Sequence, residues 1–302
     1  MTPEHGQDLP PFRLLNEGAA GLPVVLAVPH AGRRYHPDLL ARMRHPLTLP
    51  LRLEDRHADT LAQAVARLVA VPVIMAETPR AAIDLNRAED DVDWSMIAGA
   101  PGRRLRHSAA NHRARSGLGL VPRRVPGEGE IWRAPLAHAE LARRIERVHR
   151  PYHRRLGLLL ESQRDRWGAA LLVDLHSMPP LPARGADEGG GTARVVVGDR
   201  FGASCHGALS AEALRAFAES SVPVAHNRPY AGGYVLDRHG QPRRGIHALQ
   251  LEICRTVYLD GALAEPGERL PETAALLARV IRRLAAVTAM LGRGHGQVLA
   301  AE

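Results

Sequence analysis

Two histidines follow short apolar runs of the chain, and this placement suits metal chemistry. His30 comes directly after residues 22–28, and His176 lies just beyond residues 169–173. In open α/β sheets, ligands bind outside the carboxyl ends of the strands. A single histidine there is most often a hydrogen-bonded loop residue, but two at equivalent strand ends favour a shared site. Two imidazoles with one carboxylate are a common ligand set for catalytic zinc, and they leave a position open for water.

Glu54 and Asp55 are the candidates for that carboxylate, and the residues alone leave both open. They begin an expected helix, where the helix dipole also favours acidic side chains. Asp59, one turn after Asp55, is expected to support the ligand from behind it. Asp174 precedes His176 by two residues, and such residues point to the same face of a strand. We expect Asp174 either to orient the imidazole or to cap the segment that follows.

Glu252 lies inside the apolar run 248–253, where a carboxylate is costly to bury without a partner or a role. Burial would raise its pKa toward the range of a useful general base. The alternative is a structural ion pair with Arg255. We favour the catalytic role.

Arginines and an asparagine supply candidates for gripping an anionic substrate. The segment from Arg80 ends in Asn86-Arg87, and a guanidinium beside an amide can hold a carboxylate. Arg238 lies in the glycine-containing segment 229–240, which we interpret as a pliable loop. Each signal is weak alone, because ordinary turns also carry such residues.

The elements that must position these side chains alternate between strands and amphipathic helices. This pattern predicts an α/β fold, with a mostly parallel sheet covered on both faces. The expected strands are 22–28, 71–76, 169–173, 193–197, 222–225 and 248–253. The expected helices are 54–69, 135–167 with a bend near Pro151, 208–219 and 272–291. We interpret residues 91–129 as a long excursion or lid and residues 181–192 as a mobile glycine-rich segment, within one domain spanning 1–302.

Composition argues against several classes of protein. The net charge is +8, but all 40 basic residues are arginine and are spread along the chain, and aromatic residues make up only 4%. Nucleic-acid stacking platforms need more aromatic side chains, so we expect no nucleic-acid partner. No apolar run approaches the roughly 20 residues that cross a bilayer, and no secretory signal is visible. The expectation is a cytoplasmic protein without a membrane partner, in which Cys205 and Cys254 are core or near-core thiols.

Taken together and in order, several segments resemble the N-formylglutamate amidohydrolase family over roughly residues 20–260. The matching pieces are Pro29-His30-Ala31-Gly32, Glu54-Asp55 with Asp59, Pro79-Arg80 through Asn86-Arg87, Gly117-Leu118-Gly119, Asp174 to Pro179, Gly198 to Gly202, Pro229 to Gly233, Arg238-His239-Gly240 and His247 to Glu252. No piece is decisive alone, but the ordered set is specific.

That resemblance implies an architecture similar to the zinc carboxypeptidases, a three-layer α/β/α sandwich of the phosphorylase/hydrolase-like kind. It also implies one Zn²⁺ per chain, a water activated by a glutamate, and capture of the substrate carboxylate by arginine. Carboxypeptidases place the acidic ligand three residues after the first histidine, but Arg33 stands there in this chain. We therefore expect the ligands to be His30, Asp55 and His176, with Asp55 preferred to Glu54.

The function implied is hydrolysis of the amide bond of an N-acyl amino acid. The expected substrate is N-formyl-L-glutamate, cleaved to formate and L-glutamate as in histidine degradation. Glu252 would be the base, Asn86 and Arg87 would hold one substrate carboxylate, and Arg80 or Arg238 would hold the other. Alternatives are deacylation of N-acetyl or N-succinyl amino acids, removal of a short terminal residue, nucleic-acid binding, or a family member that has lost catalysis. A homo-oligomer is also left open.

Overall fold

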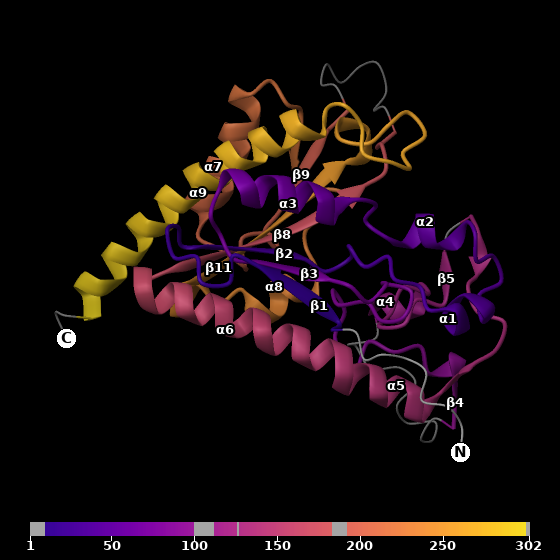
Figure 1. The fold of residues 1–302 in the computed structure, drawn as a ribbon. Coiled ribbons are helices and arrows are strands. Elements are labelled where there is room, and N and C mark those ends of the chain that lie inside the picture. The colour runs from indigo at the N-terminus through magenta and orange to yellow at the C-terminus, as the bar shows by residue number, and fades with distance from the viewer. Residues whose placement is uncertain (1–9, 100–111, 126, 183–191, 300–302) are drawn as a thin grey trace.

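A seven-stranded sheet forms the centre of the molecule, which we describe from a computed structural model covering residues 10–99, 112–125, 127–182 and 192–299 (Figure 1). In order across the sheet, the strands are β1 (Phe12–Leu15), β3 (Val73–Ala76), β2 (Val24–Val28), β8 (Ala170–Met178), β11 (Ile246–Cys254), β9 (Val195–Gly198) and β10 (Val224–His226). Strands β3, β2, β8 and β11 run parallel, whereas β1 is antiparallel to β3 and β9 is antiparallel to β11. The sheet is therefore mixed with a parallel centre, as predicted.

Helices cover both faces of this sheet. On one face lie α3 (Ala58–Leu68), α7 (Gly207–Glu219) and the long α9 (Leu270–Leu299), and on the other lie α6 (Arg150–Trp167) and α8 (Tyr234–His239) (Figure 1). The predicted three-layer α/β/α sandwich is confirmed.

The central strands are apolar on both sides because each side faces a helical layer. Along β2, Val24, Leu26 and Val28 join the core beneath α3, α7 and α9, while Val25 and Ala27 join the core over α6 and α8. Successive side chains of a strand point to opposite faces. A strand buried on both faces therefore appears in the sequence as a continuous apolar run.

Two expected helices differ from their predicted bounds. The helix expected from residue 54 begins at Ala58, because His57 adopts a left-handed conformation with φ of 55° and ends the preceding turn. The helix expected over 135–167 consists of α5 (His138–Arg144), a π-helical turn (Ile145–His149) and α6. The irregular turn therefore lies just before Pro151, which occupies the first turn of α6, where a missing amide hydrogen costs little.

The strand expected over 169–173 continues to Met178, so Asp174 and His176 lie inside β8 near its carboxyl end. Shorter elements complete the fold: α1 (Pro37–Ala41), α2 (Leu49–Leu53), a 3₁₀ turn (Trp94–Met96), β4 (Ile97–Ala98), α4 (His112–Arg115), β5 (Arg124–Val125), β6 (Gly129–Glu130), β7 (Leu136–Ala137), and 3₁₀ turns at Pro242–Arg244 and Arg255–Val257. Cys205 and Cys254 are buried free thiols, as predicted.

The segment 91–129 has apolar packing of its own in its described part. Val92, Met96, Ile97 and Leu120 form a small core that also includes Leu141 of α5. This core packs the segment against α5 and against Ile83, which follows β3 in the chain. The predicted mobility of 181–192 falls largely on residues outside the described ranges. Among the described helices, none is long and apolar enough to span a bilayer.

Candidate active site

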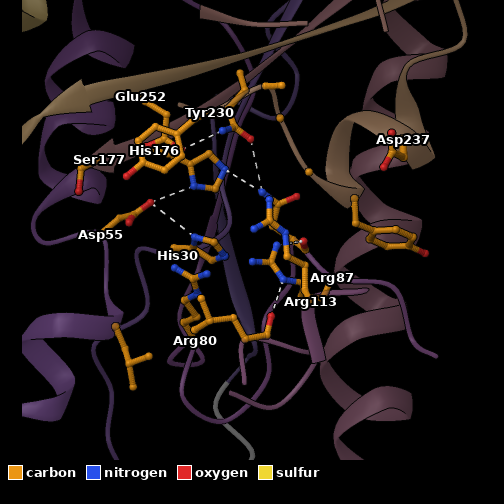
Figure 2. Close-up of a pocket in the computed structure, with 18 of the residues that line it drawn as sticks. His30, Asp55, Arg80, Arg87, Arg113, His176, Ser177, Tyr230, Asp237 and Glu252 are labelled. Atoms are coloured by element: carbon orange, nitrogen blue, oxygen red, sulfur yellow. Dashed lines mark hydrogen bonds and ion pairs between the residues drawn. The ribbon is translucent and has the colours of Figure 1, made fainter. Parts of the chain in front are cut away.

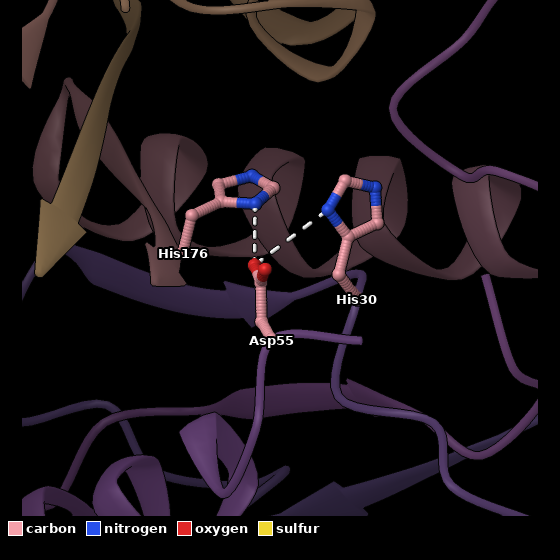
Figure 3. Close-up of side chains that lie close together, drawn as sticks. All are labelled: His30, Asp55 and His176. Carbon is pink, nitrogen blue, oxygen red and sulfur yellow. Dashed lines mark hydrogen bonds and ion pairs between the residues drawn. The ribbon is translucent and has the colours of Figure 1, made fainter. Parts of the chain in front are cut away.

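His30, Asp55 and His176 meet at the carboxyl ends of β2 and β8 (Figure 3). His30 directly follows β2, Asp55 lies in the turn before α3, and His176 belongs to β8. The Asp55 amide donates to the His30 carbonyl oxygen at 3.0 Å, and this bond joins the two loops. All three side chains are buried, and one potential ligand atom from each lies within 4.8 Å of the others. The structure thus brings together the three residues expected to hold a metal.

Each imidazole directs a defined nitrogen to Asp55. Nδ1 of His176 lies 2.9 Å and Nδ1 of His30 lies 3.6 Å from Oδ2 of Asp55. On the far side of each ring, Nε2 of His176 lies 2.9 Å from Asp174, and Nε2 of His30 lies 2.7 Å from Asp84. A carboxylate behind a histidine fixes its tautomer and makes the opposite nitrogen a better metal ligand. The donor set fits a divalent cation with oxygen and nitrogen ligands, of which zinc is one.

The charges around these rings reinforce one another. Burial disfavours a charged imidazole, but Asp174 and Asp55 on either side raise the pKa of His176 well above its ordinary value. Burial likewise disfavours a charged Asp55, yet hydrogen bonds from His176 and His30 lower the pKa of this carboxyl group. When no metal is bound, protons on the imidazoles help to balance these buried carboxylates. A buried site of this kind is suited to exchange its protons for a metal ion.

Glu252 stands beside the histidines on the neighbouring strand. In the parallel pair formed by β8 and β11, Glu252 lies opposite His176, and Gln250 lies opposite Asp174. Burial raises the pKa of Glu252 above its ordinary value. Its Oε1 accepts a hydrogen bond from Nε2 of Gln250 at 2.8 Å, and the Gln250 oxygen lies 3.4 Å from the Asn86 amide nitrogen.

Arg255 does not pair with Glu252, which was the structural alternative for that carboxylate. The Arg255 guanidinium donates to Oγ of Ser177 and to the backbone oxygens of Leu51 and Glu54. Arg255 therefore ties the turn before α3 to the end of β8. Glu54 forms an ion pair with Arg56 at 3.0 Å and does not point at the histidines, so Asp55 is the acid that joins them.

A pocket of about 700 Å³ opens from this cluster (Figure 2). Its walls are mostly polar and carry several arginines. The side chains that line it include His30, Arg52, Asp55, Arg80, Asn86, Arg87, Asp91, Arg113, His176, Arg200, Tyr230, Tyr234, Asp237, Gln250 and Glu252. A polar pocket with buried titratable groups at one end is a suitable place for a small anionic ligand.

Arg80, Asn86 and Arg87 line this pocket and share one buried partner. Asp84 accepts from Nε of Arg80 and from the backbone amide of Asn86, each at 2.8 Å. It also lies 3.9 Å from Nε of Arg87 and 2.7 Å from Nε2 of His30. Nε and Nη1 of Arg87 donate to the backbone oxygens of Leu118 and Asn86, both at 2.7 Å. Asp84 was not among the residues expected from the sequence. Its signal was an acid between Ile83 and Leu85, the same pattern that singled out Glu252.

Two expected residues lie elsewhere. Arg238 is exposed on α8, donates to the Tyr234 hydroxyl at 2.7 Å and stacks over that ring, and it is not among the residues lining the pocket. Asp59 pairs with Arg33 and Arg13, so it does not support Asp55 from behind. The structure therefore does not bring these two residues to the cluster, because the formation of α8 and the pairing of Asp59 with Arg33 depend on tertiary structure.

A row of buried histidines supports the turn at Asn86 through hydrogen bonds to its backbone. His149, in the π-helical turn, and His153, in α6, lie 2.8 Å and 3.0 Å from the backbone oxygens of Arg87 and Leu85. Since a carbonyl only accepts, Nε2 of His153 carries the hydrogen, and its Nδ1 accepts from Nε2 of His239 at 3.0 Å. Burial lowers the pKa of His153 well below its ordinary value and that of His239 to about 3. Burial therefore favours the neutral form of His153 and His239, and His149 and His153 hold the carbonyls on both sides of Asn86.

Comparisons with known proteins identify the family of this chain. A family model described as N-formylglutamate amidohydrolase matches residues 22–259. Proteins named N-formylglutamate deformylase from Pseudomonas putida and Pseudomonas aeruginosa are 32% and 29% identical to this chain; each alignment covers 79% of it and 82% and 83% of the relatives. The crystal structure of N-formylglutamate amidohydrolase from Ralstonia eutropha JMP134 superposes with a TM-score of 0.78 at 32% identity, over 93% of this chain and 99% of that one. The chain belongs to the N-formylglutamate amidohydrolase family.

Proposed function

We propose that this protein hydrolyses N-formyl-L-glutamate to formate and L-glutamate with a zinc ion held by His30, Asp55 and His176. The observation that carries the proposal is the buried cluster of these three side chains beside Glu252, at one end of an arginine-lined pocket. The names of the two Pseudomonas relatives and of the Ralstonia structure supply the substrate.

A zinc ion held by these ligands would lower the pKa of a water molecule and polarise the formyl carbonyl group. Glu252 accepts one proton from the attacking water while the water oxygen bonds to the formyl carbon. Glu252 then gives that proton to the departing amide nitrogen. The C–N bond then breaks to give formate and the amino group of glutamate. Gln250 fixes the Glu252 carboxylate through the 2.8 Å hydrogen bond.

Arg87 is suited to hold the substrate carboxylate next to the amide, because its Nε and Nη1 are fixed by backbone oxygens and direct the rest of the group into the pocket. Asn86 lines the same wall, and its amide oxygen accepts from the Val235 backbone nitrogen at 2.9 Å. Arg80 lies beside Asp84 near the catalytic end. A dianionic substrate offsets the positive charge of this wall.

The deciding experiment joins metal analysis to turnover. Wild-type protein purified without added metal should contain about one zinc per chain and release formate from N-formyl-L-glutamate. The His176→Ala variant should lose both zinc and turnover. A panel with N-acetyl- and N-succinyl-L-glutamate tests the alternative acyl groups. Wild type that takes up no metal when zinc is supplied, or that leaves N-formyl-L-glutamate intact, would refute the proposal.

A further inference from the structure

Most of the arginines that line the pocket already have partners in the protein. Arg80 is paired with Asp84, Arg200 with Asp237 at 2.6 Å, and Arg52 with Glu128 at 3.2 Å. Arg87 and Arg255 donate to backbone oxygens. Arg113, on α4, is the exception: within the described part of the chain, its guanidinium forms no hydrogen bond or ion pair, although it lines the same pocket.

Three of these arginines lie in sequence along the wall that leads away from the catalytic groups. Arg80 pairs with Asp84 at 2.8 Å, and Asp84 contacts Nε2 of His30 at 2.7 Å, which places Arg80 at the catalytic end.

Arg87 is next along this wall. Nε of Arg87 lies 3.9 Å from the same Asp84 carboxylate. Burial lowers the pKa of Arg87, and Arg113 is close enough for its charge to lower that pKa further. Figure 2 shows Arg80 below His30, with Arg87 and Arg113 next to each other to the right. The pocket therefore offers a second cationic group beside Arg87.

Asp91 fixes the short helix that carries Arg113. Its Oδ1 accepts from the Ala114 amide at 2.9 Å, and its backbone oxygen accepts from the Leu120 amide at 2.7 Å. Gly119 lets its own segment lie close to the backbone of Asp91, because a Cβ at this position would lie 2.5 Å from the Asp91 backbone oxygen. Asp91 is buried and uses its carboxylate on backbone amides, so the guanidinium of Arg113 stays available.

We propose that Arg113 binds the distal, side-chain carboxylate of a dicarboxylic N-acyl amino acid, while Arg87 binds the carboxylate next to the amide. This proposal rests on the proposed function and specifies its substrate class. A guanidinium without a protein partner keeps its donors for a carboxylate, and such charge-assisted bonds are about twice as strong as neutral ones. A substrate with a neutral amide at the distal position forfeits this contact, so the site selects acidic side chains.

The test compares N-formyl-L-glutamate with N-formyl-L-glutamine, which has the same length and no distal charge. In the Arg113→Gln variant, kcat/KM for the glutamate substrate should fall by about 10- to 100-fold, mainly through KM. For the glutamine substrate it should change by less than about threefold. Arg115→Gln, on the same turn but outside the pocket lining, is the matched control and should behave as wild type.

Equal losses on both substrates, or no loss on either, would overturn the role of Arg113. A wild type that cleaves neither substrate would refute the proposed function, and a binding measurement then tests Arg113 alone. By calorimetry on the metal-loaded protein, wild type should bind L-glutamate more tightly than L-glutamine, and Arg113→Gln should remove that preference. An unchanged preference in the variant would refute the proposal whatever the catalytic result.

Discussion

Replacing Asp84 with asparagine tests whether the carboxylates behind the histidines tune a metal site. Asp84 is fully buried, and it contacts Nε2 of His30 at 2.7 Å and Nε of Arg80 at 2.8 Å. Burial would raise its pKa, but the charges of Arg80 and His30 hold the pKa well below its ordinary value. The Asp84→Asn variant keeps the shape of the side chain and removes its charge, so His30 becomes a poorer ligand and Arg80 loses its counter-ion.

The substitution should have two effects, one on metal affinity and one on the stability of the fold. Loss of a carboxylate behind a ligating histidine weakens metal affinity by about 10- to 100-fold, which corresponds to about 1.4–2.8 kcal/mol. Removing one partner of a buried ion pair destabilises the fold by about 3–5 kcal/mol. We expect the upper part of this range here, because Oδ1 of Asp84 accepts from the Asn86 amide and Oδ2 accepts from Arg80, and the single asparagine oxygen can keep only one of these bonds.

Metal affinity is measured by competition with a chromogenic chelator, and stability by urea unfolding of the metal-free protein. Asp59→Asn is the matched control, because Asp59 is also a carboxylate paired with arginines but faces Arg13 and Arg33 instead of a histidine. It should lower stability and leave metal affinity within about twofold of wild type. If the Asp84→Asn variant binds the metal as tightly as wild type does, the idea that Asp84 acts through His30 is refuted.

Three further outcomes are expected. Glu252→Gln should reduce turnover by about 10²- to 10⁴-fold and retain the metal, because it removes a proton acceptor without removing a ligand; substantial activity in a rate assay would contradict its role as base. His239→Gln should make stability less sensitive to acid. Since burial and the Arg238 charge lower the pKa of His239 to about 3, only the unfolded chain takes up this proton below about pH 6.5, so the wild type loses stability as pH falls. Urea unfolding between pH 6 and pH 4 measures how the free energy of unfolding changes with pH. The slope of that change should be smaller in the variant than in wild type by about 1.4 kcal/mol per pH unit. An unchanged slope would show that the ring already takes up a proton in the folded protein. Arg87→Gln should raise KM for N-formyl-L-glutamate at least about tenfold, whereas Arg238→Gln should leave KM within about twofold; the reverse order would place the carboxylate site on α8.

Features of the fold and the site that depend on residues close together in the chain were predictable from the sequence. The sheet layers follow from apolar runs, and His30 and His176 follow from their places at the ends of such runs. Glu252 was predictable because a carboxylate in an apolar strand requires a reason. The similarity to the architecture of zinc carboxypeptidases, the cytoplasmic location and the oligomeric state stay predictions from the resemblance and the composition.

Features that depend on long-range pairing were not predictable. Asp84 and His30 are 54 residues apart in the chain, and only the fold brings them into contact. Residues 229–240 were interpreted as a pliable loop, but Tyr234 to His239 form α8, which turns Arg238 away from the pocket. The tertiary packing of α8 against the sheet outweighs the local glycine signal.

The pairing of β8 with β11 has a consequence for how related chains can vary in length. Asp174 and His176 lie opposite Gln250 and Glu252 in one parallel ladder, so the spacing between Glu252 and His176 is set by hydrogen bonds of the sheet. One residue inserted within either strand would turn the side chains beyond it to the opposite face. Insertions and deletions in relatives should therefore fall in the connecting loops and spare both strands. Substrate preference can then diverge through the pocket walls, while the spacing between Glu252 and His176 stays constant.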